Sequence, residues 1–157
     1  MKLLAALLYL LPLTVWAQNR SLKLYIGLSP AGDFVASSNK VRGFVTRESG
    51  QFEAKELSVS VGSLSSQQDT RDEHMWEKLG GKTAKIEVKD AKGHNGTGTA
   101  TLVVNGKPKP ISFTYEDKKQ YVLAKFTVTL SDYGIAASML GITVEDKAKV
   151  EAEIPLN

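Results

Sequence analysis

The chain has 157 residues, and its hydrophobic fraction of 42% is enough for one globular domain with its own core, which excludes disordered and collagen-like chains. The 20 Lys and Arg residues are interleaved with 17 Asp and Glu residues, so the net charge of +3 gives no surface suited to nucleic acid. Because cysteine is absent, the sequence also excludes disulfides, thiolate nucleophiles and cysteine metal sites.

The first 17 residues have the features of a secretory signal peptide. Lys2 gives a positive start, an apolar run follows as far as Trp16, and residues 15–17 suit a signal-peptidase site. The run is shorter than the ~20 residues of a membrane-spanning helix, and Pro12 interrupts it. We therefore expect cleavage near Ala17, a mature domain of residues 18–157, and a periplasmic or secreted location.

From residue 21 onward the main pattern is an alternation of apolar and polar residues, which is typical of β-strands with one buried face. The alternation recurs at residues 22–28, 57–61, 84–88, 111–115, 122–130 and 148–154. Asn105-Gly106 favours a tight hairpin turn, and residues 93–96 and 116–120 form further polar turns. We predict an all-β fold, an antiparallel closed β-barrel of about eight strands, because closure removes exposed strand edges.

One segment departs from the β pattern. Thr70 and Glu73 have the spacing of a capping box, in which two side chains satisfy the free backbone donors at a helix start. An apolar side formed by Met75, Trp76 and Leu79 follows, and residues 80–81 are glycines suited to a helix end. The sequence therefore predicts one short helix near residues 71–79, closing one end of the barrel.

Small residues on the inward faces of the strands indicate that the barrel interior could hold a ligand. They are Gly98, Ala100, Ala124, Ala148 and Ala152. The alternative is an ordinary packed core, in which small residues serve close approaches between strands.

Three motifs in order resemble the YceI-like polyisoprenoid-binding family. Residues 63–75 are similar to its Ser/Thr-rich run that leads into Arg-Asp-x-His-Leu, residues 102–111 to its Leu-Thr-Ile-x-Gly-x-Thr-Lys-Pro-Val hairpin, and residues 131–135 to its Ser-Asp-Phe-Gly segment. The resemblance covers about residues 57–154. It implies a lipocalin-like barrel, often exported, that holds a long isoprenoid or fatty tail without a cofactor.

The predicted ligand-binding residues are inward apolar side chains of the strands and of the apolar segment at residues 133–142. They are Val59, Val61, Ile86, Val88, Leu102, Val104, Phe113, Phe126, Val128, Ile135 and Met139. Arg71, Asp72 and His74 are expected at the barrel end. The expected partner is a hydrophobic, lipid-like small molecule, with transient contact to a membrane surface as a further option; the oligomeric state stays open, a dimer included.

Two other functions are weighed against this non-catalytic carrier. A small β-barrel enzyme could act on a lipid with Arg71, Asp72 and His74 at the mouth, or a solid-core β module could bind other proteins. Residues two apart on a helix point in different directions, which disfavours an acid/base pair of Asp72 and His74. Only His94 could complete a histidine metal site, so no metal is expected. The serines at residues 63–66 lack the nucleophile elbow of hydrolases.

Overall fold

The structure is a computed structural model that describes residues 19–135, 138, 139 and 141–157, with only the backbone of residues 138 and 139. The predicted signal peptide, residues 1–17, lies outside the described residues. The elements are β1 (Ser21–Ile26), β2 (Leu28–Ser29), β3 (Phe34–Ser38), β4 (Thr46–Glu48), β5 (Gln51–Ser60), the 3-10 turn η1 (Val61–Ser63), α1 (Asp69–Lys78), β6 (Lys85–His94), β7 (Thr97–Val104), β8 (Lys107–Asp117), β9 (Tyr121–Thr129), the 3-10 turn η2 (Leu130–Tyr133), β10 (Ser138–Met139), β11 (Ile142–Val144) and β12 (Lys147–Pro155).

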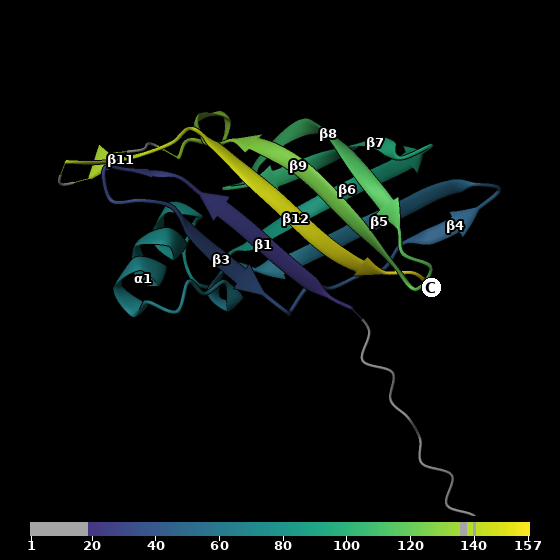
Figure 1. Cartoon of the computed structure of the whole chain (residues 1–157), viewed down its shortest axis with the longest axis horizontal. Helices are drawn as coiled ribbons and strands as arrows, with labels where there is room; N and C mark the ends of the chain where they lie inside the picture. Colours follow the sequence, from purple (N-terminus) through teal and green to yellow (C-terminus); the bar gives the residue numbers. More distant parts are fainter. Residues whose placement is uncertain (1–18, 136–137, 140) are drawn as a thin grey trace, which may run out of the picture.

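A nine-stranded antiparallel sheet dominates the fold, in the order β3-β1-β12-β9-β8-β7-β6-β5-β4, and a small sheet has the order β10-β11-β2. Figure 1 shows the large sheet curled around a long axis, with α1 and the small sheet at one end and β4 at the other. The predicted all-β, antiparallel and barrel-like fold with a single short helix is confirmed for the described residues.

The alternation of apolar and polar residues correctly predicted the buried faces of the strands. In β12, for example, Ala148, Val150, Ala152 and Ile154 are buried while the residues between them are more exposed. The predicted segment at residues 22–28 is divided at Gly27 into β1 and β2. β3 and β4 were not predicted, because β3 has only five residues, the last two of them serines, and β4 has only three, all of them polar.

The predicted hairpins are also confirmed. Asn105 and Gly106 have φ angles of 52° and 69°, and both residues of a type I′ turn require such positive values. Asn95 and Gly96 repeat this geometry between β6 and β7, with φ angles of 52° and 83°. The third predicted turn connects β8 to β9, where the Lys118 N–H donates to the Tyr121 carbonyl at 2.9 Å.

Closure of the sheet differs from the prediction of a closed barrel. Among the described residues, the two edge strands β3 and β4 are not joined by a ladder. Isolated bridges instead connect β3 and the segment that follows it to Ser65, Ser58 and Leu156. Arg42 and Ser58 exchange backbone hydrogen bonds of 2.8 and 3.1 Å, which hold the connection between β3 and β4 against β5. Gly43 permits this approach, because its φ is 105° and a Cβ there would lie 2.6 Å from the Glu56 carbonyl.

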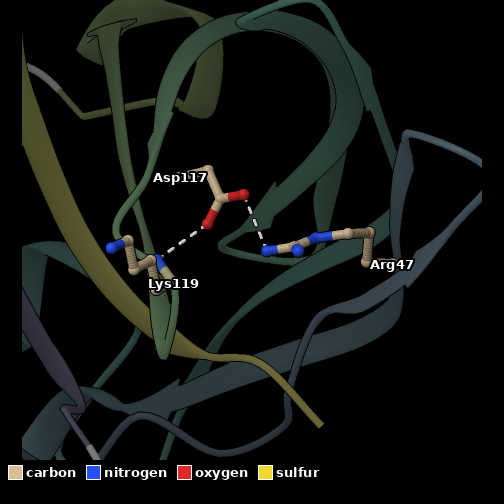
Figure 2. A network of polar contacts seen from close by, with 3 residues as sticks. All are labelled: Arg47, Asp117 and Lys119. Carbon is tan, nitrogen blue, oxygen red and sulfur yellow. Dashed lines mark hydrogen bonds and ion pairs between the residues drawn. The ribbon is translucent and has the colours of Figure 1, made fainter.

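A polar network also ties β4 to the opposite part of the sheet (Figure 2). The Arg47 guanidinium donates to one carboxylate oxygen of Asp117 at 2.7 Å, and the Lys119 N–H donates to the other at 2.8 Å. Both side chains of the ion pair are well exposed, so it contributes at most ~1 kcal/mol to stability. Its role is to position the edge strand near the turn between β8 and β9.

The predicted capping of the helix start is wrong. α1 begins at Asp69, its N-cap is Gln68, and no side chain caps it, so Thr70 lies inside the helix and the expected capping box does not form. Asp72 instead turns its carboxylate back to the serines that precede the helix. The helix end is close to the prediction, with Lys78 as the last residue and Gly80 at a φ of 101°.

A first expected result concerns Gly98, which pairs with Phe113 between β7 and β8. A Cβ at Gly98 would overlap the Phe113 ring and the Lys92 carbonyl oxygen, so part of the sheet must shift. We expect Gly98→Ala to lower the free energy of unfolding by ~1–3 kcal/mol, measured by urea denaturation. The outward neighbour Thr99→Ala is the control, with a change within about 0.5 kcal/mol. Equal stability of both variants would show that the close approach is absent in solution.

Candidate functional site

An apolar cavity of about 520 Å³ lies inside the curled sheet. Its wall is made of side chains from β1, β3, β5 to β9 and β12, together with α1 and β11. The volume is within the ~300–1,000 Å³ usual for small-molecule sites. Three of the predicted small inward residues, Ala124, Ala148 and Ala152, lie in the wall, whereas Gly98 and Ala100 do not.

Most of the predicted ligand-binding residues come together around this cavity, although their contact with a ligand stays a prediction. Those in the wall are Val59, Ile86, Val88, Leu102, Val104, Phe113, Phe126, Val128 and Ile135. Val61 is fully buried in η1 and is not part of the wall. The side chain of Met139 lies outside the described residues.

The predicted ligand-binding residues did not include several wall residues of β1, β5, β9 and β12. They are Leu22, Leu24, Ile26, Leu57, Val122 and Val150. All of them occupy the inward positions of the predicted strands, so the alternation could have identified them. The residues from the connection between β3 and β4, Val41 and Val45, had no such signal because no strand forms there.

An aromatic group forms the wall near the β4 end. The ring centroids of Phe52 and Tyr115 are 5.1 Å apart, and those of Phe113 and Tyr115 are 6.1 Å apart, both in tilted geometry. Tyr115 packs over Gly93, where a Cβ would lie 2.6 Å from the ring. These rings give this part of the cavity an aromatic, apolar surface.

The α1 end of the cavity is polar and basic. Thr70, Arg71, His74 and Lys78 all lie in the wall there. The Arg71 guanidinium sits 4.6 Å from the centroid of the Phe34 ring, a cation–π contact that holds it beside the apolar lumen. Among the described residues, no carboxylate lies within ion-pair distance of Arg71 or Lys78. This end of the cavity therefore carries positive charge that no ion pair neutralises.

Asp72 is placed differently from its two neighbours in the motif, because its carboxylate faces away from the cavity. The carboxylate is buried and accepts hydrogen bonds from the Ser65 hydroxyl at 2.9 Å, the Ser66 N–H at 2.8 Å and the Ser66 hydroxyl at 2.6 Å. Burial raises the pKa of Asp72, but the hydrogen bonds from Ser66 and Ser65 and the charge of Arg71 outweigh it, so the pKa lies below its ordinary value. Asp72 is thus a structural anion that fixes the segment before α1.

Two further contacts fasten α1 to the sheet. Trp76 donates its indole N–H to the Leu64 carbonyl at 2.8 Å. The Asn105 amide of the β7–β8 turn donates to the Lys78 carbonyl at 3.0 Å and to the Tyr133 carbonyl at 3.1 Å. Both ends of the helix are therefore held by hydrogen bonds.

The geometry gives no support to a metal centre built from the two histidines. His94 belongs to the end of β6 that pairs with Gln51, near β4, whereas His74 lies on α1 at the opposite end of the molecule (Figure 1). In the described part of the chain, no three His, Asp or Glu side chains are grouped as metal ligands. The helices of that part also include none that is long and apolar enough to cross a bilayer.

Comparison with known proteins assigns the family. The YceI-like domain matches residues 28–156, which is most of the chain. This protein belongs to the YceI-like family. No curated protein matches it.

Two solved structures share the fold of this YceI-like protein. BcnA of Burkholderia cenocepacia is 10% identical, with a TM-score of 0.61 and coverage of 85% of this chain and 94% of that one. A polyisoprenoid-binding domain from Saccharophagus degradans, described as implicated in plant cell wall breakdown, is 12% identical, with a TM-score of 0.55 and coverage of 88% and 95%. At these identities the likeness establishes the fold.

Proposed function

We propose that this YceI-like protein is an exported, non-catalytic carrier or scavenger that holds a long hydrophobic ligand, an isoprenoid or a fatty lipid, inside its curled sheet. The observation that carries the proposal is the apolar cavity of about 520 Å³, whose wall is drawn from nearly the whole sheet. The polyisoprenoid-binding domain of S. degradans, which has the same fold, supports the same ligand class.

The energetics of the cavity suit a hydrocarbon chain. Each buried methylene group contributes ~0.8 kcal/mol, so roughly ten of them would give ~8 kcal/mol before the entropy cost of binding. The apolar wall offers few hydrogen-bonding partners along its length. We therefore expect it to select ligands by the length of the hydrocarbon chain and not by polar groups along that chain. Selectivity would then arise at the polar α1 end.

A non-catalytic role is supported by the arrangement at that end. An enzyme with Arg71, Asp72 and His74 at the mouth would need a base oriented by an acid, as in known acid/base sites. Asp72 is instead committed to Ser65 and Ser66, and His74 has no hydrogen bond to a protein group among the described residues. The export part of the proposal depends on the signal-peptide features of residues 1–17.

Native mass spectrometry of the purified full-length product tests the carrier function. We expect a co-purifying hydrophobic adduct, and we expect delipidated protein to melt at a lower temperature than protein with a long-chain lipid restored. The reason is that a ligand that binds only the native state adds ~2.7 kcal/mol of stability at a hundredfold excess over its Kd. Absence of an adduct together with equal melting temperatures at saturating lipid would contradict a carrier.

The basic α1 end leads to an expected preference for an anionic head group. Hydrogen bonds to a charged group are worth ~1.5–3 kcal/mol, so Arg71→Gln should weaken binding of a long-chain fatty acid by roughly 10- to 100-fold. The neutral alcohol of the same chain length should lose less than about threefold, because its chain contacts are unchanged. Fluorescence competition measures both affinities, and Lys23→Gln, on the exposed face of β1, controls for net charge. Equal losses for acid and alcohol would place the head group elsewhere.

A further inference from the structure

The hydrogen-bonded ladder of the curled sheet is interrupted between β8 and β9. β8 pairs with β9 only from Thr114 to Asp117, opposite residues Lys125 to Val122. β7 and β8 are paired from one hairpin end to the other, and β9 is paired with β12 over all of its residues. The part of β8 before Thr114 therefore has one neighbour, and it forms a seam with the part of β9 after Lys125.

Two prolines keep the β8–β9 ladder from resuming along the first part of β8. Alternate residues of a strand direct their backbone groups to opposite neighbours. The Tyr115 N–H donates to the Gly96 carbonyl on the β7 side at 2.9 Å. The backbone N–H and C=O groups of the even-numbered residues of β8 therefore point toward β9. Pro108 and Pro110 are even-numbered and have no N–H to donate. Ser112 keeps its N–H on that side, but the two even-numbered residues before it have none, so a ladder could not extend past Ser112 to close the seam.

Outside the sheet, the seam opens into a cleft of about 630 Å³. Its rim carries outward polar side chains, among them Ser112 and Thr127. Its floor includes Phe113 and Phe126, and both of these half-buried residues also belong to the wall of the inner cavity. Extending the observed β8–β9 register by one residue beyond Thr114 and Lys125 would place the two phenylalanines opposite each other. Their rings therefore stand between the cavity and the outer cleft.

We infer that this seam is the passage through which the hydrocarbon chain of the ligand enters and leaves the cavity, with Phe113 and Phe126 as the side chains that move. The inference rests on the proposed carrier function. Widening the seam breaks no backbone hydrogen bond, because none is formed there. Moving α1 would instead break the bonds of Asp72, Trp76 and Asn105.

The seam suits a hydrocarbon chain better than an added peptide strand. A docking strand needs a continuous row of backbone donors and acceptors, and Pro108 and Pro110 interrupt the row on β8. The floor of aromatic rings offers dispersion contacts to a chain that slides past it. Phe113 also packs directly over Gly98, and the missing side chain there is what admits the ring to this position.

A reversible cross-link across the seam tests the passage. Because the chain has no native cysteine, two introduced cysteines are the only thiols that can react. Extending the β8–β9 register by two residues places Ser112 opposite Thr127, so we expect the two thiols of Ser112→Cys/Thr127→Cys to face each other across the seam. Oxidation joins them when the Cα atoms come within ~7 Å. A short bismaleimide joins them if the seam stays wider. The control Glu56→Cys/Lys89→Cys joins two exposed residues that are already partners between β5 and β6 and that line neither the cavity nor the outer cleft.

The protein is loaded with a fluorescent polyene fatty acid, and its transfer to phosphatidylcholine vesicles is followed in time. We expect the seam cross-link to slow transfer at least tenfold, reduction of the disulfide to restore it, and the control cross-link to leave it unchanged. Phe126→Ala should accelerate transfer several-fold more than Val128→Ala, the next inward residue on β9. If the probe binds but the seam cross-link does not change the transfer rate, the passage is wrong and the carrier function stands. If the wild type binds no probe at all, both the carrier function and the passage are wrong.

Discussion

Replacing Asp72 with alanine is expected to lower the free energy of unfolding by ~3 kcal/mol, among the largest effects of any single substitution in this chain. Asp72 is only 3% exposed, and its carboxylate accepts three hydrogen bonds from Ser65 and Ser66. Bonds to a charged acceptor are worth ~1.5–3 kcal/mol each, and their loss leaves the Ser66 N–H without its acceptor. Urea denaturation measures the change, with Asp69→Ala in the exposed first turn of α1 as the control, expected to cost under ~1 kcal/mol.

The pH dependence of stability gives the same carboxylate a second signature. Its pKa in the folded protein lies below the ordinary value of 3.8, so folding favours the ionised form. This contribution is complete above about pH 3.8 and is lost as the pH falls from there through the lower pKa of the folded state. The stability difference between the wild type and Asp72→Asn, which cannot titrate, should therefore be constant near neutral pH and shrink in that acid window. A difference that does not change with pH would mean that Asp72 is not held as a carboxylate.

The error at the helix start shows where local sequence patterns stop being sufficient. Thr70 and Glu73 have the spacing of a capping box, and that pattern correctly indicated a helix within one or two residues. The acceptor that matters is Asp72, because β5 and η1 deliver Ser65 and Ser66 to its side chain. That contact depends on the path of the chain before the helix, which a four-residue window does not contain.

The residues that line the cavity could be predicted from the sequence, but the presence of a cavity could not. Alternation identifies the inward face of each strand, and Val88, Leu102 and Val128 accordingly lie in the cavity wall. Whether such faces enclose a cavity or pack against one another depends on the curl of the sheet and on how it is closed. In the described part of the chain, no ladder joins the edge strands β3 and β4; isolated bridges connect β3 and the segment after it to other parts of the chain, and no periodic pattern in the sequence encodes these bridges.

The seam lies between these two cases. Pro108 and Pro110 are visible in the sequence, and their spacing of two already says that they face the same side of a strand. Which neighbour loses its donors follows only from the register, here from the bond between Tyr115 and Gly96. Once the register is known, these two residues account for the missing donors that keep the first part of β8 from pairing with β9.

Filling the cavity should remove ligand binding without unfolding the protein, and Ala124→Phe is the variant that shows it. Ala124 lies in the cavity wall, between Tyr115 on β8 and Ala152 on β12. A phenyl ring there would occupy space that the ligand needs. We expect binding of a long-chain fatty acid to weaken at least tenfold, which corresponds to ~1.4 kcal/mol or more. Leu123→Phe, the outward neighbour on β9, should leave the affinity unchanged.

The stability of the ligand-free variant separates a container from a solid core. In a packed core the same ring would force its neighbours apart and cost ~1–3 kcal/mol. In a cavity of about 520 Å³ the ring meets open space, so delipidated Ala124→Phe should be as stable as the delipidated wild type or more so. Thermal unfolding of both delipidated proteins decides the matter. A melting temperature that falls by several degrees while fatty-acid binding is retained would mean that Ala124 packs in a filled interior and that the ligand lies elsewhere.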